Sequence, residues 1–181
     1  MALVLLAGAM WLPPLRAAEQ APPRLLMAEV EWIDLAPPEQ RYDQAEDAAR
    51  VRLLDARLRQ RLRQASAYRL LDDASARRPP PYRYSDCRAC VVDWAVKLGA
   101  QRLLLTWVQK ESRLILSLNM QLIDPQRGVA LAGGSLDLRG NTEAIWLAGA
   151  DQLLQRTLDL ELLPAPLTDL GRAAAAGTAI P

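Results

Sequence analysis

The chain has 181 residues, with 22 basic and 21 acidic side chains and a net charge of +1. This length suits one domain with an apolar core, and a nearly neutral chain lacks the basic surface typical of nucleic-acid-binding proteins. There is no histidine, which removes the commonest general base, every Ser–His or Cys–His nucleophile pair and most zinc sites.

The first residues have the pattern of an export signal. An apolar run over residues 2–12 is too short to cross a bilayer, and the small residues Ala17 and Ala18 offer a cleavage point after it. We therefore expect a signal peptide over residues 1–18, rather than a buried helix, and a soluble mature protein in the periplasm. Because this segment has no cysteine to acylate, we expect that the protein is not a lipoprotein.

The first half of the mature chain alternates between expected strands and helices. Residues 24–35 alternate and are bounded by prolines, which predicts a strand. Residues 40–67 lack glycine and proline and carry apolar side chains three and four apart, which predicts an amphipathic helix. A short strand over residues 68–73, a proline-rich loop, and a helix over residues 87–100 capped by Asp86 and Gly99 follow.

The second half of the chain is predicted to form a three-stranded meander followed by a C-terminal helix. Three strands, residues 101–110, 113–124 and 129–140, are joined by short turns and are followed by a helix over residues 141–160. The order β-α-β-α-β-β-β-α predicts an α+β two-layer sandwich, with a mixed sheet, a C-terminal meander and helices on one face. We expect one domain over residues 24–163 and a flexible tail over residues 164–181.

Several motifs resemble a known family. The stretches LGAQRLLLTWVQKESRLILSLNMQLIDPQRG and GSLDLRGNTEAIW, with EVEWIDL and DCRACVVDWAVKLGA before them, resemble a proteobacterial family of secreted proteins, the domain of unknown function 2380 or its near neighbour 3280. Glu143, Ala144 and Trp32 stand where that family usually has Asp, Ser and Phe. The element order also resembles the amino-terminal domain of TolB and CsgG-like periplasmic domains, a likeness that implies binding of protein partners without catalysis.

Cys87 and Cys90 form the chain's Cys-x-x-Cys motif, which has two interpretations. Thiols at the start of a helix have lowered pKa values and exchange readily, so a thiol–disulfide redox protein is one. Asp86 next to the pair disfavours a thiolate, and the motif does not follow a first strand as it does in thioredoxin-like folds. An exported protein with two cysteines favours a structural disulfide instead.

The turn from Arg139 to Thr142 is the sharper candidate for a binding site. Gly140 permits a positive φ, Asn141 or Thr142 caps the following helix, and Glu143 suits its first turn. These structural roles do not account for Arg139. One interpretation is that Arg139 pairs locally with Asp137 or Glu143, and the other is that it holds a carboxylate of a ligand or partner.

Polar residues on one side of the predicted sheet extend this candidate site. Asn119 and Gln121 lie on that side, and we expect Asp137 and Arg139 beside them on the adjacent strand, where these residues form either a solvated surface or a binding surface. Arginines on the first helix alternate with acidic residues, and we expect a solvated face or at most a weak contact with the membrane surface. Without a carboxylate pair, a phosphate loop or metal-ligand spacing, the sequence predicts no cofactor and no enzyme, and favours an adaptor for an envelope protein.

Overall fold

We describe the protein from a computed structural model, which describes residues 21–41, 44–72, 83–112 and 114–159. The expected signal peptide, the expected C-terminal tail and most of the proline-rich loop lie outside these residues. Within these ranges, none of the helices combines the length and the apolar character needed to cross a membrane.

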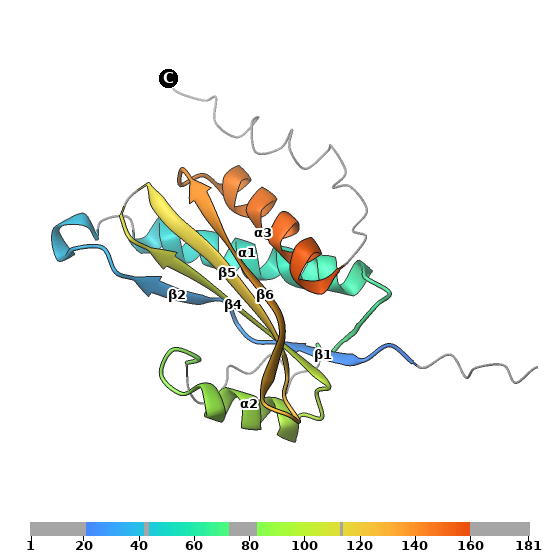
Figure 1. The fold of residues 1–181 in the computed structure, drawn as a ribbon. Coiled ribbons are helices and arrows are strands. Elements are labelled where there is room, and N and C mark those ends of the chain that lie inside the picture. Colours follow the sequence, from blue (N-terminus) through green and yellow to red (C-terminus); the bar gives the residue numbers. More distant parts are fainter. Residues whose placement is uncertain (1–20, 42–43, 73–82, 113, 160–181) are drawn as a thin grey trace, which may run out of the picture.

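The elements follow the expected order, with a further N-terminal strand and a short 3-10 helix added. They are β1 (Arg24–Met27), β2 (Glu31–Asp34), a short 3-10 helix (Pro38–Gln40), α1 (Gln44–Gln64), β3 (Arg69–Leu70), α2 (Arg88–Lys97), β4 (Arg102–Lys110), β5 (Ile115–Asp124), β6 (Val129–Arg139) and α3 (Glu143–Leu158). The α+β fold, the mixed sheet and the C-terminal meander are confirmed (Figure 1).

The sheet is mixed because its first strands run parallel to β4. The strand order is β3-β1-β4-β5-β6, and β2 also pairs with β4. The single strand expected over residues 24–35 is therefore two strands. The chain leaves β4 between them, where the backbone N–H of Val30 donates to the Asp55 carboxylate at 3.3 Å instead of to the sheet.

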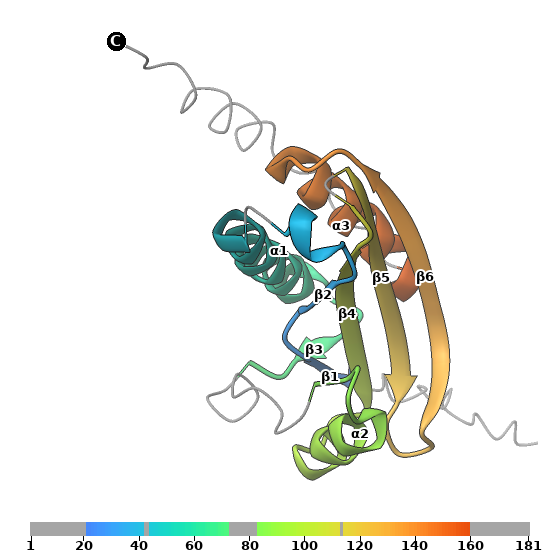
Figure 2. The ribbon, with the colours of Figure 1, turned by 90° about the vertical axis from the view of Figure 1, so that its left-hand side faces the viewer.

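The helices cover both faces of the sheet, which corrects the expectation of helices on one face. Helices α1 and α3 pack together on one face over a core that includes Leu54, Leu118 and Leu154. Helix α2 packs on the opposite face of the sheet from α1 and α3 (Figure 2). There, Val91 and Ala95 meet apolar side chains of β1 and β4. Strands β1, β4 and the end of β5 are apolar on both sides. The alternation of polar and apolar residues therefore does not predict which face of the sheet α2 covers.

Strand β5 shows the polarity of the sheet most clearly. Its Leu116, Leu118 and Met120 are buried beneath α1 and α3. Its Ser117, Asn119 and Gln121 are half-buried and lie on the other side, because successive side chains of a strand point to opposite faces. We call the sheet face opposite α1 and α3 the polar face; α2 covers one end of it.

Candidate functional site

The Arg139–Thr142 turn joins β6 to α3. Gly140 has a φ of +116°, a conformation that glycine adopts without steric cost. Thr142 is the N-cap of α3, and its hydroxyl accepts a hydrogen bond from the Ile145 N–H at 3.4 Å. Glu143 lies in the first turn, near the positive end of the helix dipole. Gly140 and Thr142 therefore have the local structural roles that their residue types indicate.

Asn141 turns its side chain inward, away from the polar face. Its Oδ1 accepts a hydrogen bond from the indole Nε1 of Trp146 at 3.0 Å. Its Nδ2 donates to the Asp47 carboxylate at 3.3 Å. Because these contacts occupy both ends of the amide, Asn141 joins β6 and α3 to α1.

Asp47 accepts a hydrogen bond from the Lys110 ammonium at 2.6 Å, and the side chains of both residues are only 2 % exposed. The Asp47 carboxylate also accepts from Arg50 at 3.1 Å. A buried charge is costly unless it is paired and hydrogen-bonded, and here three donors meet one carboxylate. The pair joins the start of α1 to the end of β4.

Two stacked tryptophans adjoin this ion pair, one of them in contact with Lys110. The Lys110 ammonium lies 5.6 Å from the centre of the Trp32 ring, within the range of a cation–π contact. Trp32 stacks on Trp146 with ring centroids 5.9 Å apart and planes at 22°. We call Asp47, Lys110, Asn141, Trp32 and Trp146 the buried cluster.

The buried cluster as a unit was not predicted, although the sequence contains a signal for it. Asp47 stands four residues before Val51 and so continues the apolar stripe of α1, and Lys110 follows Val108 on the apolar side of β4. Two opposite charges on two faces that are otherwise apolar indicate a buried pair. Lys110 and Asn141 come from two of the stretches that resemble the family, and both residues belong to the buried cluster.

Arg139 and Asp137 lie on the polar face, and both are exposed. Arg139 is opposite Ile115 and Asp137 is opposite Ser117 in the ladder between β5 and β6. Within the part of the chain that the structure describes, neither side chain makes an ion pair or a hydrogen bond. The local pairing of Arg139 with Asp137 or Glu143 is therefore not the arrangement in this structure.

Asn119 and Gln121 lie further along the same face and are partly engaged. Asn119 donates to the Ser117 hydroxyl at 3.2 Å. Gln121 accepts a hydrogen bond from the Tyr84 hydroxyl at 3.0 Å, and the Tyr84 ring packs on Trp107 at 5.7 Å. The segment before α2 thus covers the Gln121 end of the polar face, whereas no described segment covers the Arg139 end.

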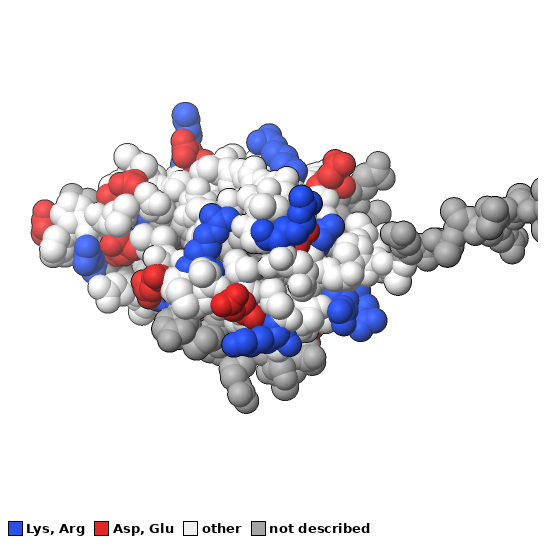
Figure 3. Space-filling view, turned by 60° about the horizontal axis from the view of Figure 1, so that its bottom comes forward, with Lys and Arg blue, Asp and Glu red and all other residues white. Residues whose placement is uncertain are grey.

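The open end of the polar face combines apolar and charged side chains. Ile115 is 61 % exposed, and Leu114 and Leu35 are 65 % and 53 % exposed. The backbone places them in one region, since Leu35 N–H donates to Lys110 C=O and Glu111 N–H donates to Ile115 C=O, each at 2.9 Å. We call Leu35, Ile115, Asp137 and Arg139 the open end. On another face of the molecule, the bottom of Figure 1 turned toward the viewer in Figure 3, positive and negative side chains are interspersed without a large region of one sign.

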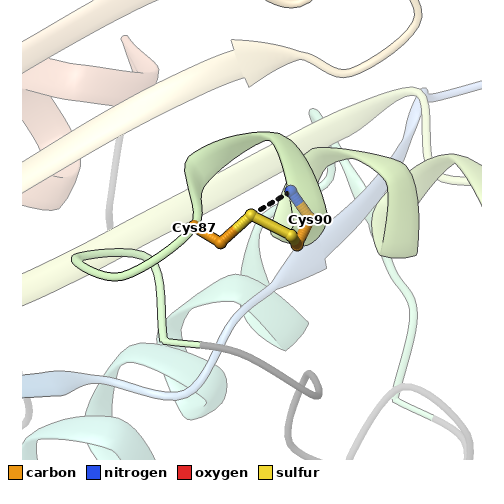
Figure 4. Close-up of a disulfide and its surroundings, with 2 residues drawn as sticks. All are labelled: Cys87 and Cys90. Carbon is orange, nitrogen blue, oxygen red and sulfur yellow. Dashed lines mark hydrogen bonds between the residues drawn. A yellow bond between two sulfur atoms is a disulfide. The ribbon is translucent and has the colours of Figure 1, made fainter.

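Cys87 and Cys90 are joined by a disulfide at the start of α2 (Figure 4). Cys87, rather than the expected Asp86, is the N-cap, and its sulfur accepts a hydrogen bond from the Cys90 N–H at 3.2 Å. The disulfide follows directly on the segment that carries Tyr84. It therefore holds the beginning of α2 together where the chain crosses the polar face.

A second charged contact joins α1 to α3. Asp151 receives two hydrogen bonds each from Arg57 and Arg61, between 2.7 and 3.1 Å long. Burial raises the pKa of the Asp151 carboxyl, but the hydrogen bonds from Arg61 and Arg57 and their positive charges outweigh it, so the net pKa is lowered. This carboxylate is a structural ion-pair partner between two helices.

Three bacterial proteins of known structure are similar to parts of this chain. The LpoB C-terminal domain from Salmonella enterica has a TM-score of 0.43 and 17 % identity, over 68 % of this chain and 87 % of that chain. A PelC dodecamer from Paraburkholderia phytofirmans has 0.44 and 14 %, over 76 % and 88 %. TolB from Acinetobacter baumannii has 0.44 and 12 %, over 75 % and 28 %.

A search of the curated proteins found no match. The family comparison is positive and covers most of the chain. Residues 23–158 match the family DUF3280, whose description is "Protein of unknown function (DUF2380)". The match spans every strand of the sheet and all three α-helices, and it includes the disulfide, the buried cluster and the Arg139–Thr142 turn. The chain therefore belongs to this family of proteins of unknown function.

Proposed function

We propose that this protein is a non-enzymatic binding or adaptor module of the periplasm, which attaches to an envelope protein through the open end of its polar face. The observation that carries the proposal is the pair Asp137 and Arg139. Both side chains are exposed and have no partner among the described residues, while Asn141 in the next turn is fully engaged.

The composition of the open end supports this proposal. Protein interfaces combine an apolar centre with a polar rim, and arginine is enriched among the residues that contribute most to binding. Ile115 provides an exposed apolar side chain directly opposite Arg139. A partner carboxylate that pairs with the Arg139 guanidinium would form a charge-assisted hydrogen bond.

Two features support a place in the periplasm. The apolar segment over residues 2–12 has the length of a signal-peptide core. The disulfide between Cys87 and Cys90 is typical of proteins in oxidising compartments. We propose that the mature protein is the single domain over residues 24–163, with residues 164–181 as a tail.

The proposal is tested by crosslinking in intact cells. A photoreactive amino acid at Ser117, beside Asp137 on the polar face, captures whatever lies over the open end. Capture is compared between the native sequence, Arg139→Ala, and the matched control Arg127→Ala, which removes an exposed arginine from the turn at the other end of β6.

We expect one envelope protein to be captured by the native form and by Arg127→Ala, and to be lost with Arg139→Ala. Circular dichroism and the unfolding midpoint establish that both variants are folded. Equal capture by folded Arg139→Ala and by the native form contradicts the proposal.

A further inference from the structure

Strand β6 is the last strand at one edge of the sheet, and its outer side is not paired with another described strand. It is 11 residues long and, in the described part of the chain, pairs only with β5 (Figure 2). An edge strand has backbone N–H and C=O groups along its outer side without partners, and another strand can pair with them. Most β6 residues are exposed. Strand β6 contacts α3 through one face of the strand and not through its outer edge, since a Cβ added to Gly134 would meet Leu153 of α3.

This edge lacks most of the devices that keep edges from pairing. Such devices are prolines, lysines, inward-pointing charges, short strands and bulges. The irregularity in β6 lies beside Leu131, where the ladder shifts opposite Leu122 and Ile123. Beyond it, residues 132–139 form a regular ladder with β5, and residues 132–136 contain neither a charge nor a proline.

The charges of β6 lie together at the end of this regular ladder. Asp137 and Arg139 are two residues apart, so both side chains are on the polar face. In a paired strand, the side chains directly opposite them would be about 5 Å away, close enough for opposite charges to attract and like charges to repel. The pair therefore specifies an incoming strand with an acidic residue opposite Arg139 and a basic residue opposite Asp137.

We infer that the outer edge of β6, residues 132–139, binds an extended segment of the partner protein as an added antiparallel strand. Read from its N-terminus, the segment has an acidic residue, any residue, a basic residue, and then five uncharged residues. The antiparallel direction follows from the greater stability of antiparallel pairing. The inference rests on the proposed function and deepens it by naming the conformation and charge pattern of the bound segment.

A second copy of this chain does not supply such a segment from β6. Its own acidic–any–basic sequence is Asp137 to Arg139, and the next residue, Gly140, leaves the strand with a φ of +116°. Asn141 then binds inside the molecule and Thr142 starts α3. No strand continues past Arg139 to pair with the uncharged part of the edge. The other match to the pattern in the chain, residues 111–118, runs into β5, which is already paired with β4 and β6. We therefore assign the bound segment to a different protein.

The test uses a synthetic peptide as the probe. The peptide acetyl-Glu-Val-Lys-Thr-Val-Thr-Val-Thr-amide is titrated into the purified, ¹⁵N-labelled protein, and amide shifts and hydrogen exchange are followed by NMR. We expect saturable shifts centred on β6, slower exchange of its outward amides, and about tenfold weaker binding of the charge-reversed peptide Lys-Val-Glu-Thr-Val-Thr-Val-Thr. The double variant Asp137→Arg/Arg139→Asp should invert this preference, a result that unfolding cannot produce.

Backbone pairing is separated from side-chain binding by two N-methylated peptides. One carries N-methyl groups on alternate residues whose N–H groups face β6, and the other carries them on the remaining residues. We expect one peptide to lose binding and the other to keep it, because an added strand uses one edge of its backbone. Equal effects of the two methylation patterns, equal affinity for both charge patterns, or shifts centred outside β6 overturn the inference.

Failure of the strand pairing and failure of the proposed function give different results in these two experiments. If the peptides do not bind while Arg139-dependent capture occurs in cells, the strand pairing is wrong and the adaptor proposal stands. If the peptides bind at β6 while no Arg139-dependent partner is captured, the edge accepts strands but the adaptor proposal fails.

Discussion

Asp47 and Lys110 form an ion pair 2.6 Å long between the first turn of α1 and the last residue of β4, and both side chains are almost completely buried. The two residues are 63 positions apart in the chain. Because Asn141 also binds Asp47, one carboxylate holds together α1, β4 and the turn that leads into α3. The charged residues of the cluster are structural, while Arg139, two residues before Asn141, faces the other way.

The first prediction concerns this ion pair. Asp47→Asn should lower the free energy of unfolding by about 3–5 kcal/mol, because it leaves the buried Lys110 ammonium without its counter-charge. The double variant Asp47→Leu/Lys110→Met should recover much of this loss, since it removes both buried charges. Urea unfolding measures both.

Glu46→Gln is the matched control for Asp47→Asn. Glu46 is the preceding residue and pairs with Arg50, but its side chain is 65 % exposed. We expect its loss to cost no more than about 0.5 kcal/mol. If both substitutions lowered the free energy of unfolding by a similar amount, burial would not be the reason that the Asp47–Lys110 pair stabilises the fold.

Asn141 and Arg139 should differ in their effects on stability although they are two residues apart. Asn141→Ala removes the partner of the Trp146 indole and one donor to Asp47, and should cost about 1–3 kcal/mol. Arg139→Ala removes an exposed side chain without a partner among the described residues, and should change stability by less than about 0.5 kcal/mol. Thermal and urea unfolding of the two variants compare them directly; the reverse order would contradict the inward and outward placement of the two side chains.

The Arg57–Asp151–Arg61 contact should contribute to acid sensitivity. The folded pKa of Asp151 is lowered by its two arginines, so the carboxylate favours the folded state above the unfolded pKa of about 3.9, and this contribution is lost as pH falls through the folded pKa. Unfolding free energy measured between about pH 6 and pH 2 should therefore fall less steeply below pH 4 in Asp151→Asn than in the native protein. Parallel curves would mean that Asp151 does not titrate differently in the folded state.

The disulfide should stabilise the protein modestly. Cys87 and Cys90 are separated by three positions, and closing so short a loop contributes about 2 kcal/mol in the chain-entropy account. The Cys87→Ser/Cys90→Ser variant should fold with this loss of stability and should still capture the partner at Ser117. Loss of capture by the folded variant would favour the thiol–disulfide interpretation of the motif.

Most of the fold could be predicted because its signals are local. The meander follows from alternation in β5 and from the turn at Asp124, whose carboxylate accepts hydrogen bonds from two following N–H groups. The face covered by α2 could not be predicted, because the apolar side chains of Val91 and Ala95 suit either side of the sheet. The division between β1 and β2 was also missed, since alternation continues through the gap where Val30 turns to Asp55.

The candidate site was predicted in part. The turn chemistry of Gly140 and Thr142 follows from residue type and position. The inward direction of Asn141 does not, because it depends on Asp47 and Trp146, and Asp47 lies 94 positions away in the chain. Long-range hydrogen bonds of this kind leave no periodic pattern, and they separate Asn141 from Arg139 within one turn.

The parallel pairing of β1 and β2 with β4 has a consequence for the order of folding. Arg24 and Gln101, which join the start of β1 to the start of β4, are 77 positions apart, whereas β4, β5 and β6 follow one another through short turns. Contacts between distant residues form slowly because a long loop must close first. We therefore expect the meander to form before the N-terminal strands pair with it, and we expect these strands, although synthesised first, to keep their apolar side chains exposed until then.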